Sequence, residues 1–216
     1  MRTATAENRK AARGSAGPDA ITLLRSDHAG VRKLFREYRK LCEGNGRTVE
    51  RSELANRICE ELTVHAILEE EIFYPALREA LDHQDILNEA EVEHATAKDL
   101  ISQIEQAEPG DELYDARVIV LGEYIDHHVD EEEGEMFRQA RKAGVDLQAL
   151  GGAMALRRQE LIDELGLAEA DDDDAAEDED EDDEEEFEDE NALDDEDEDE
   201  DEDDDDEEDD EDEATH

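Results

Sequence analysis

The stretch at residues 61–75, ELTVHAILEEEIFYP, decides the fold of this chain. Read as an α-helix, which turns about 100° per residue, it places His65 and Glu69 one turn apart on one face. Apolar side chains share that face, so an imidazole and a carboxylate lie inside an apolar stripe. A buried carboxylate is costly unless it is paired or binds a metal. A surface glutamate beside a core histidine is the alternative interpretation of this pair taken alone.

Five stretches of the chain show the 3-and-4 spacing of apolar residues that predicts an amphipathic helix. Clusters of Gly, Pro, Asn and Asp separate them, and Pro75 is expected to kink or loosen the second helix. The fold class is therefore all-α: an up-down-up-down four-helix bundle with a short fifth helix against its outside. The predicted helices cover residues 19–43, 48–80, 85–107, 112–142 and 146–165.

One histidine lies in the apolar seam of each of the four long helices. In each case apolar residues stand about two turns away along the same face, as Ile21 and Phe35 do around His28. Histidine is only intermediate in burial, so four such positions are more than chance burial predicts. The four residues are His28, His65, His94 and His128.

These histidines also fall at matching heights in an antiparallel bundle. His28 lies 15 residues before Glu43, and His65 lies 15 residues after Glu50, on the two sides of the first connection. At a rise of about 1.5 Å per residue they stand at the same level. Counted from the connection at residues 107–111, the other two match to within about one turn.

Carboxylates complete the pattern, because Glu69 follows His65 by four residues and Glu132 follows His128 by four. Oxygen and nitrogen ligands that project inward from four helices suit iron or manganese, and they do not form a thiolate-rich zinc site. Two carboxylates able to bridge indicate two metal ions. We assign no catalytic residue, and the expected ligands are His28, His65, Glu69, His94, His128 and Glu132.

The fourth long helix leaves alternatives open. His127 and Glu131 also form a pair four residues apart, but their face carries acidic residues and is expected to be solvated. Glu133 stands about 140° from His128 on a regular helix, and a local helix irregularity would bring it closer. Both His127 and Glu133 therefore remain possible ligands.

The residues from about 20 to 165 resemble the hemerythrin-like family, also called HHE cation-binding domains. This resemblance implies a non-haem di-iron centre that binds oxygen or related small ligands, with the six residues named above as its ligands. Manganese or partial loading remains an alternative. The matching motifs are Leu24-Arg25-Ser26-Asp27-His28, His65-x-x-x-Glu69-Glu70-Glu71, Tyr74-Pro75, Glu93-His94 and His127-His128-Val129-Asp130-Glu131-Glu132-Glu133-Gly134-Glu135-Met136-Phe137.

One position departs from the family's pattern. Oxygen carriers of this family have a second histidine on the third helix, where this chain has Ala90 and Lys98; Glu91 is the remaining candidate ligand there. The departure argues against reversible oxygen carriage. We therefore expect a protein that binds or senses O2, peroxide, nitric oxide or iron. An enzyme that consumes peroxide or nitric oxide is the alternative, and the sequence does not show turnover.

The charge of the chain divides it into three expected regions. From Glu169 to Glu213 there are 38 acidic residues and no Lys or Arg, which leaves 35 acidic against 21 basic residues elsewhere. Such a run cannot bury a core and is expected to be disordered. It solvates the protein or binds a basic protein partner, and it repels nucleic acid. An interaction protein that acts through this tail is therefore a further functional alternative. The expected regions are a disordered basic arm at 1–18, the bundle at 19–167 and the acidic tail at 168–216.

Other features of the sequence concern its compartment. No apolar run approaches the roughly 20 residues that a membrane-spanning helix needs. The basic N-terminus lacks the apolar core of a secretory signal, so we expect a cytoplasmic protein without a membrane partner. Cys42 and Cys59 do not make a disulfide framework and are expected to be reduced.

Overall fold

The structure is a computed structural model that describes residues 17–44 and 46–167. The predicted acidic tail, and all of the predicted basic arm except its last two residues, lie outside this range. No helix in the described ranges is long and apolar enough to cross a bilayer. The helical elements are α1 (Ala20–Glu43), α2 (Thr48–Leu68), η1 (Glu69–Phe73), α3 (Tyr74–Ala80), α4 (Asp85–Gln106), α5 (Tyr114–Glu131), η2 (Glu132–Met136), α6 (Phe137–Ala143) and α7 (Leu147–Leu165).

Local sequence explains where the helices begin and end. The Asp19 side chain accepts a hydrogen bond from the backbone N–H of Thr22, which caps α1, and Asp146 caps α7 in the same way. Gly144 ends α6 with a positive φ of 72°, a conformation that glycine adopts at little cost. The helix ends therefore follow the predicted breakers to within about two residues.

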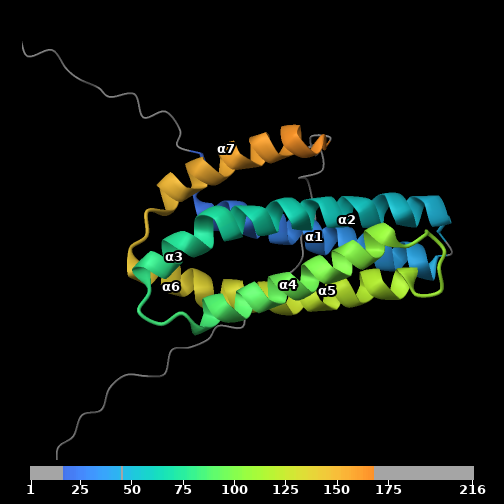
Figure 1. Cartoon of the computed structure of the whole chain (residues 1–216), viewed down its shortest axis with the longest axis horizontal. Helices are drawn as coiled ribbons and strands as arrows, with labels where there is room; N and C mark the ends of the chain where they lie inside the picture. Colours follow the sequence, from blue (N-terminus) through green and yellow to red (C-terminus); the bar gives the residue numbers. More distant parts are fainter. Residues whose placement is uncertain (1–16, 45, 168–216) are drawn as a thin grey trace, which may run out of the picture. The chain divides into compact units, whose positions relative to one another are not determined.

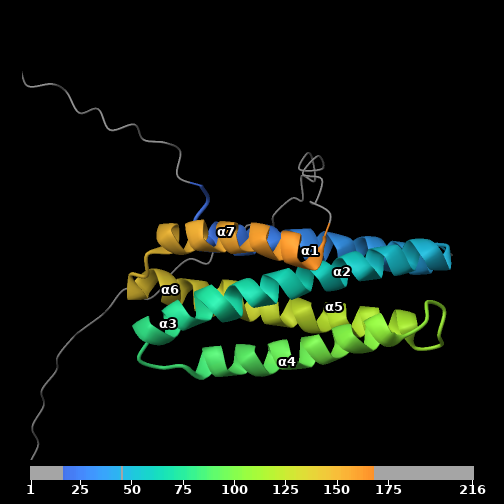
Figure 2. The same ribbon diagram turned by 45° about the horizontal axis from the view of Figure 1, so that its top comes forward.

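Four long helical segments form the bundle, and they run alternately up and down (Figures 1 and 2). α1 and α4 are two of these segments. The second consists of α2, η1 and α3, and the fourth consists of α5, η2 and α6. α1 packs against α2 and α5, while α4 packs against the same two helices from the other side. This arrangement confirms the predicted all-α, up-down-up-down four-helix bundle.

α7 is the fifth helix, and it lies against the outside of the bundle along α1 and α2 (Figure 2). It packs closely where Gly151 meets the chain ahead of α1: a β-carbon on Gly151 would lie 2.8 Å from the backbone nitrogen of Ala20. Arg157 and Arg158 extend from α7 to carboxylates of the bundle. The fifth helix is therefore in contact with the helices that carry the first two seam histidines, His28 and His65.

Short π-helical segments interrupt the second and fourth long helices. η1 begins at Glu69, ahead of Pro75, and Pro75 lies in the first turn of α3. The irregularity expected at Pro75 therefore starts earlier in the chain. η2 begins at Glu132, so the fourth long helix has a local irregularity next to Glu133. Each π segment adds one residue to a helical turn and so changes which side chains face the bundle axis.

The bundle core has two apolar clusters. One lies toward the first helix connection and includes Phe35, Tyr38 and Ile58; the other lies toward α3 and α6 and includes Phe73 and Phe137. The four seam histidines belong to neither cluster. Cys59 is buried in the first cluster, Cys42 is half-buried beside it, and both are free thiols, as expected.

Candidate metal centre

Six ionisable side chains are buried at the centre of the bundle. Within the described residues they are the complete set of buried His and acidic side chains, and Glu69 has no exposed surface at all. They come from α1, α2, η1, α4, α5 and η2, so each long helical segment contributes at least one. They are His28, His65, Glu69, His94, His128 and Glu132, the six side chains expected from the sequence.

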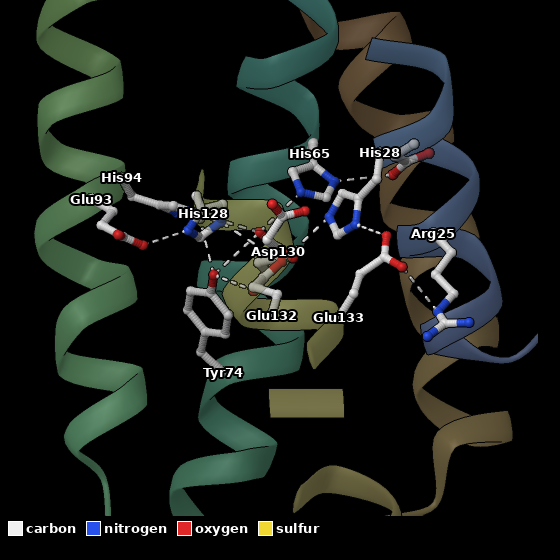
Figure 3. A network of polar contacts seen from close by, with 12 residues as sticks. Arg25, His28, His65, Tyr74, Glu93, His94, His128, Asp130, Glu132 and Glu133 are labelled. Atoms are coloured by element: carbon white, nitrogen blue, oxygen red, sulfur yellow. Dashed lines mark hydrogen bonds and ion pairs between the residues drawn. The ribbon is translucent and has the colours of Figure 1, made fainter. Parts of the chain in front are cut away.

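Each of the two glutamates contacts two of the histidines, and Figure 3 shows Glu132 beside the imidazoles. Glu69 Oε2 is 3.2 Å from His65 Nε2 and 3.3 Å from His94 Nε2. Glu132 Oε2 is 3.3 Å from His28 Nε2 and 3.7 Å from His128 Nε2. Each carboxylate therefore spans two imidazoles that belong to different helices.

These atoms form two overlapping groups that could hold a metal ion. One consists of His28, His65, Glu69 and Glu132, and the other of Glu69, His94 and His128; in each group the ligand atoms lie within 4.8 Å of one another. Glu69 belongs to both. A shared carboxylate between two imidazole-rich groups is the donor arrangement expected for two neighbouring ions.

Unsatisfied atoms test whether this cluster fits a metal. In the described residues four buried side-chain nitrogen or oxygen atoms have no hydrogen-bond partner, and three of them are His28 Nε2, Glu69 Oε1 and Glu132 Oε2. Leaving a buried polar atom unpaired costs about 1–3 kcal/mol. Three such atoms at one point would be compensated by a bound cation, so the donor set fits a metal ion.

A second layer of carboxylates contacts the outer nitrogen of every imidazole in the cluster. His28 Nδ1 lies 2.8 Å from Glu133 and His128 Nδ1 lies 2.7 Å from Glu93. The same contact joins His94 Nδ1 to Glu70 at 2.9 Å and His65 Nδ1 to Asp27 at 3.3 Å. When Nδ1–H donates to a carboxylate, the Nε2 lone pair is left free to bind a metal.

Cations support three of these four outer carboxylates. Arg158 of α7 donates to Asp27, Lys98 donates to Glu70 at 2.5 Å, and Arg25 lies 3.4 Å from Glu133. Contact with His28 holds the pKa of Glu133 below its usual value. Burial raises the pKa of Glu70, but Lys98 and His94 outweigh it and the pKa is lowered. These outer groups therefore stay ionised and accept the Nδ1 protons.

The inner groups show the reciprocal effect. Burial lowers the pKa of His65, but Glu69 and Asp27 outweigh it and hold the pKa well above its usual value. Burial raises the pKa of Glu69, but His65 and His94 outweigh it and hold the pKa well below its usual value. His65 and Glu69 therefore stabilise each other in their charged forms, and a bound cation would compete with the proton on His65.

Tyr74 is a member of the site that the sequence reasoning missed. Its hydroxyl donates to Glu132 Oε1 at 2.8 Å and lies 3.3 Å from Glu69 Oε2 and 3.2 Å from His94 Nε2 (Figure 3). η1 brings it there, because the backbone N–H of Tyr74 bonds to the carbonyl of Glu69, five residues earlier. The sequence signal for this contact is the spacing Glu-x-x-x-x-Tyr before a proline. On a regular helix two residues five apart do not share a face, so the spacing does not indicate a contact there.

The three possible ligands named from the sequence lie outside the inner cluster. Glu133 is on the outer side of His28, as described above. The His127 side chain is 66% exposed and pairs with Glu131 at 3.3 Å on the surface. Glu91 is 55% exposed and pairs with Arg78 at 2.7 Å.

Known proteins show similarity to this chain. The model of the family described as "Hemerythrin HHE cation binding domain" matches residues 19–140. A crystal structure of a hemerythrin HHE cation binding domain-containing protein from Mycobacterium kansasii matches with a TM-score of 0.57 and 25% identity, over 68% of this chain and 89% of that one. A DNA nickase from Nostoc sp. is 30% identical over 119 residues, which are 55% of this chain but only 32% of that relative.

Proposed function

Because this chain belongs to the hemerythrin HHE cation-binding domain family and is a metal-binding protein, we propose that its buried cluster holds two iron ions and binds O2, peroxide or nitric oxide. The proposal depends on the position of Glu69, whose carboxylate belongs to both groups of candidate metal ligands. Iron in such a site supplies redox chemistry and open positions for a small ligand.

The chain's own residues have defined parts in this proposal. His28 and His65 with Glu132 would hold one ion, His94 and His128 the other, and Glu69 would bridge them. The outer carboxylates orient the four imidazoles and keep each Nδ1 protonated. Tyr74 donates a hydrogen bond to Glu132, and its hydroxyl also lies close to Glu69.

Turnover of peroxide is a second candidate function, and the helix α4 favours it over reversible oxygen carriage. α4 supplies one imidazole, His94, to the cluster. Ala90 is a buried apolar residue, and the ammonium of Lys98 is engaged by Glu70. With fewer imidazoles, more coordination positions are left for exogenous ligands.

Metal analysis of the full-length protein, purified without added chelator, tests the proposal. We expect about two irons per chain and an ultraviolet-visible spectrum that changes when peroxide or nitric oxide is added. Reversible change on exposure to air and its removal would support binding of O2, whereas catalytic loss of peroxide would support turnover. A protein that retains zinc, or that takes up no iron under anaerobic ferrous loading, would contradict the di-iron proposal.

A further inference from the structure

A cavity of about 320 Å³ reaches the four histidines of the cluster. His28, His65, His94 and His128 line it, whereas Glu69, Glu132 and Tyr74 do not. The cavity therefore approaches the cluster from its imidazole side, away from the Tyr74 hydroxyl. In Figure 3 Tyr74 and Glu132 lie on one side of the imidazoles, and neither residue lines the cavity.

The size of this cavity exceeds what a diatomic ligand requires. A water molecule has a share of about 30 Å³ in the liquid, so the cavity has room for the order of ten waters. Pockets that bind small organic molecules begin at about 300 Å³. Two metal ions and one diatomic ligand would leave most of this volume unused.

The walls of the cavity are apolar above the histidines. Five buried apolar residues line it: Val31 of α1, Leu62 and Ala66 of α2, and Ala97 and Ile101 of α4. An apolar chamber of this volume gains little from water, because water inside it would find few hydrogen-bond partners. It gains more from an apolar occupant, at roughly 25 cal/mol per Å² of apolar surface removed from water.

Polar side chains at the mouth set the charge of the occupant. Four charged side chains line the cavity: Asp27 of α1, Glu61 of α2, and Lys98 and Glu105 of α4. Lys98 is engaged by Glu70 at 2.5 Å, so its charge is already balanced. Burial, and then the charge of Asp27, raise the pKa of Glu61, as expected for acidic groups that crowd one opening. An acidic rim repels anions, and the apolar walls disfavour any charged group inside the cavity, which leaves neutral molecules.

We propose that this cavity binds a neutral, mostly apolar organic molecule whose oxygen-bearing end, a hydroxyl or hydroperoxide, faces the four histidines. The inference rests on the proposed function, since the four histidines that the oxygen end would face are the residues that would hold the iron. It identifies the ligand class of the site as organic, where the cluster geometry alone requires only a diatomic molecule or peroxide.

Calorimetric titration of the iron-loaded, full-length protein with 2-phenyl-2-propanol, a neutral aryl alcohol, tests the inference. Ala97→Phe places a ring inside the cavity, and Ala95→Phe makes the same change at an exposed position on the same helix. We expect the alcohol to bind the wild type and Ala95→Phe, and to bind Ala97→Phe at least tenfold more weakly with unchanged iron content. A shift of the iron absorption bands on binding would place the oxygen end at the histidines.

A second variant and an anionic ligand extend the test. If Ala97→Phe does not fold, Ser102→Phe at the half-buried mouth is expected to give the same loss. 2-Phenylpropanoate, an anion of similar shape, is expected to bind at least tenfold more weakly than the alcohol. Equal binding of the anion, no binding to the iron-loaded wild type, or equal binding to Ala97→Phe would each overturn the inference. A wild type without iron would instead overturn the proposed function, and the same titration would still show whether the cavity takes the alcohol.

Discussion

Each imidazole of the cluster has one nitrogen directed inward and one held by a carboxylate. The outer contacts come from different segments: Glu133 follows Glu132 on η2, and Asp27 precedes His28 on α1. A carboxylate next to an inner ligand in sequence therefore orients the imidazole of a neighbouring helix. Substituting either layer is expected to affect metal affinity, and the inner layer more strongly.

Replacing an inner ligand is the most direct prediction. We expect His65→Ala to lower the iron content from about two ions per chain to one or none. The melting temperature of the iron-loaded protein should fall with it, because metal binding is coupled to folding. Elemental analysis and calorimetry measure the two effects. His127→Ala is the control, since His127 lies on the surface; unchanged iron in His65→Ala would contradict the assignment of His65.

Tyr74→Phe keeps the buried ring and removes the hydroxyl that donates to Glu132. We expect iron affinity, measured by competition with a chelator, to fall about 10- to 100-fold, the range seen for groups that support metal ligands. Tyr38→Phe is the matched control, because Tyr38 is equally buried and donates to Asp115 in the first apolar cluster. It should cost about 1 kcal/mol of stability and leave iron affinity unchanged. Equal iron affinity in the two variants would remove Tyr74 from the site.

The two thiols give a prediction about pH. Burial, and then the negative charges of Glu105 and Glu60, raise the pKa of Cys59 to about 12. The thiolate is the reactive form, so at pH 8 Cys59 should not react with an aromatic disulfide reagent in the native protein, and its reactivity should rise with pH. After denaturation without reductant, two thiols per chain should react. Rapid reaction of Cys59 at pH 8, or fewer than two thiols, would contradict this reading.

At the scale of elements, the two π segments determine which side chains form the site. Each begins at a glutamate of the cluster, and an aromatic residue stands five residues after that glutamate: Tyr74 after Glu69, and Phe137 after Glu132. Tyr74 donates its hydroxyl to the cluster, and Phe137 stacks on His28 with 5.9 Å between ring centroids. The second and fourth long helices thus use the same local device, with a polar ring in one and an apolar ring in the other.

The sequence predicted the helices and the inner side chains because both follow from the spacing of apolar residues. His28 and His65, expected at one height, have ring centroids 4.9 Å apart. The π segments were not predicted, because hydrophobic spacing does not reveal one added residue per turn within acidic runs. The contact of Tyr74 with Glu132 and the contact of Glu133 with the outer nitrogen of His28 depend on those segments, so neither contact was predicted from the sequence.

The attachment of α7 gives a prediction at this scale. A β-carbon at Gly151 would collide with the backbone oxygen of Pro18, whereas one at Gly152 would meet nothing within 4 Å. We expect Gly151→Ala to destabilise the protein by about 1–3 kcal/mol in urea unfolding. Gly152→Ala, its neighbour in the same helix, should stabilise it by up to about 1 kcal/mol.

The same pair of variants tests whether α7 supports the metal site. Arg158 of α7 donates to Asp27, which holds His65. Displacing α7 in Gly151→Ala should therefore lower iron affinity, while Gly152→Ala should leave it unchanged. Equal stability and equal iron affinity in both variants would show that α7 can be displaced without consequence for the bundle.

At the scale of the whole molecule, charge and metal binding are separated along the chain. The 38 acidic residues between Glu169 and Glu213 account for most of the net charge of −52, while the six histidines and glutamates that are buried in the described part of the chain lie between His28 and Glu132. Carboxylates are hard oxygen ligands and hold divalent cations, but a tight site also needs fixed geometry. We therefore propose that the acidic stretch binds basic partners and that the cluster binds iron.

Removing residues 169–216 tests this division of labour. We expect the truncated chain to keep its helical circular dichroism, its two irons and its spectrum, because an acidic run lacks the apolar side chains that would dock it on the bundle. Binding to polylysine should be lost, whereas the intact chain should bind it at low salt and release it as salt screens charges beyond about 8 Å. Neither protein should bind duplex DNA. If truncation removed iron or helical content, the acidic stretch would be part of the folded unit, and the boundary expected near Leu167 would be wrong.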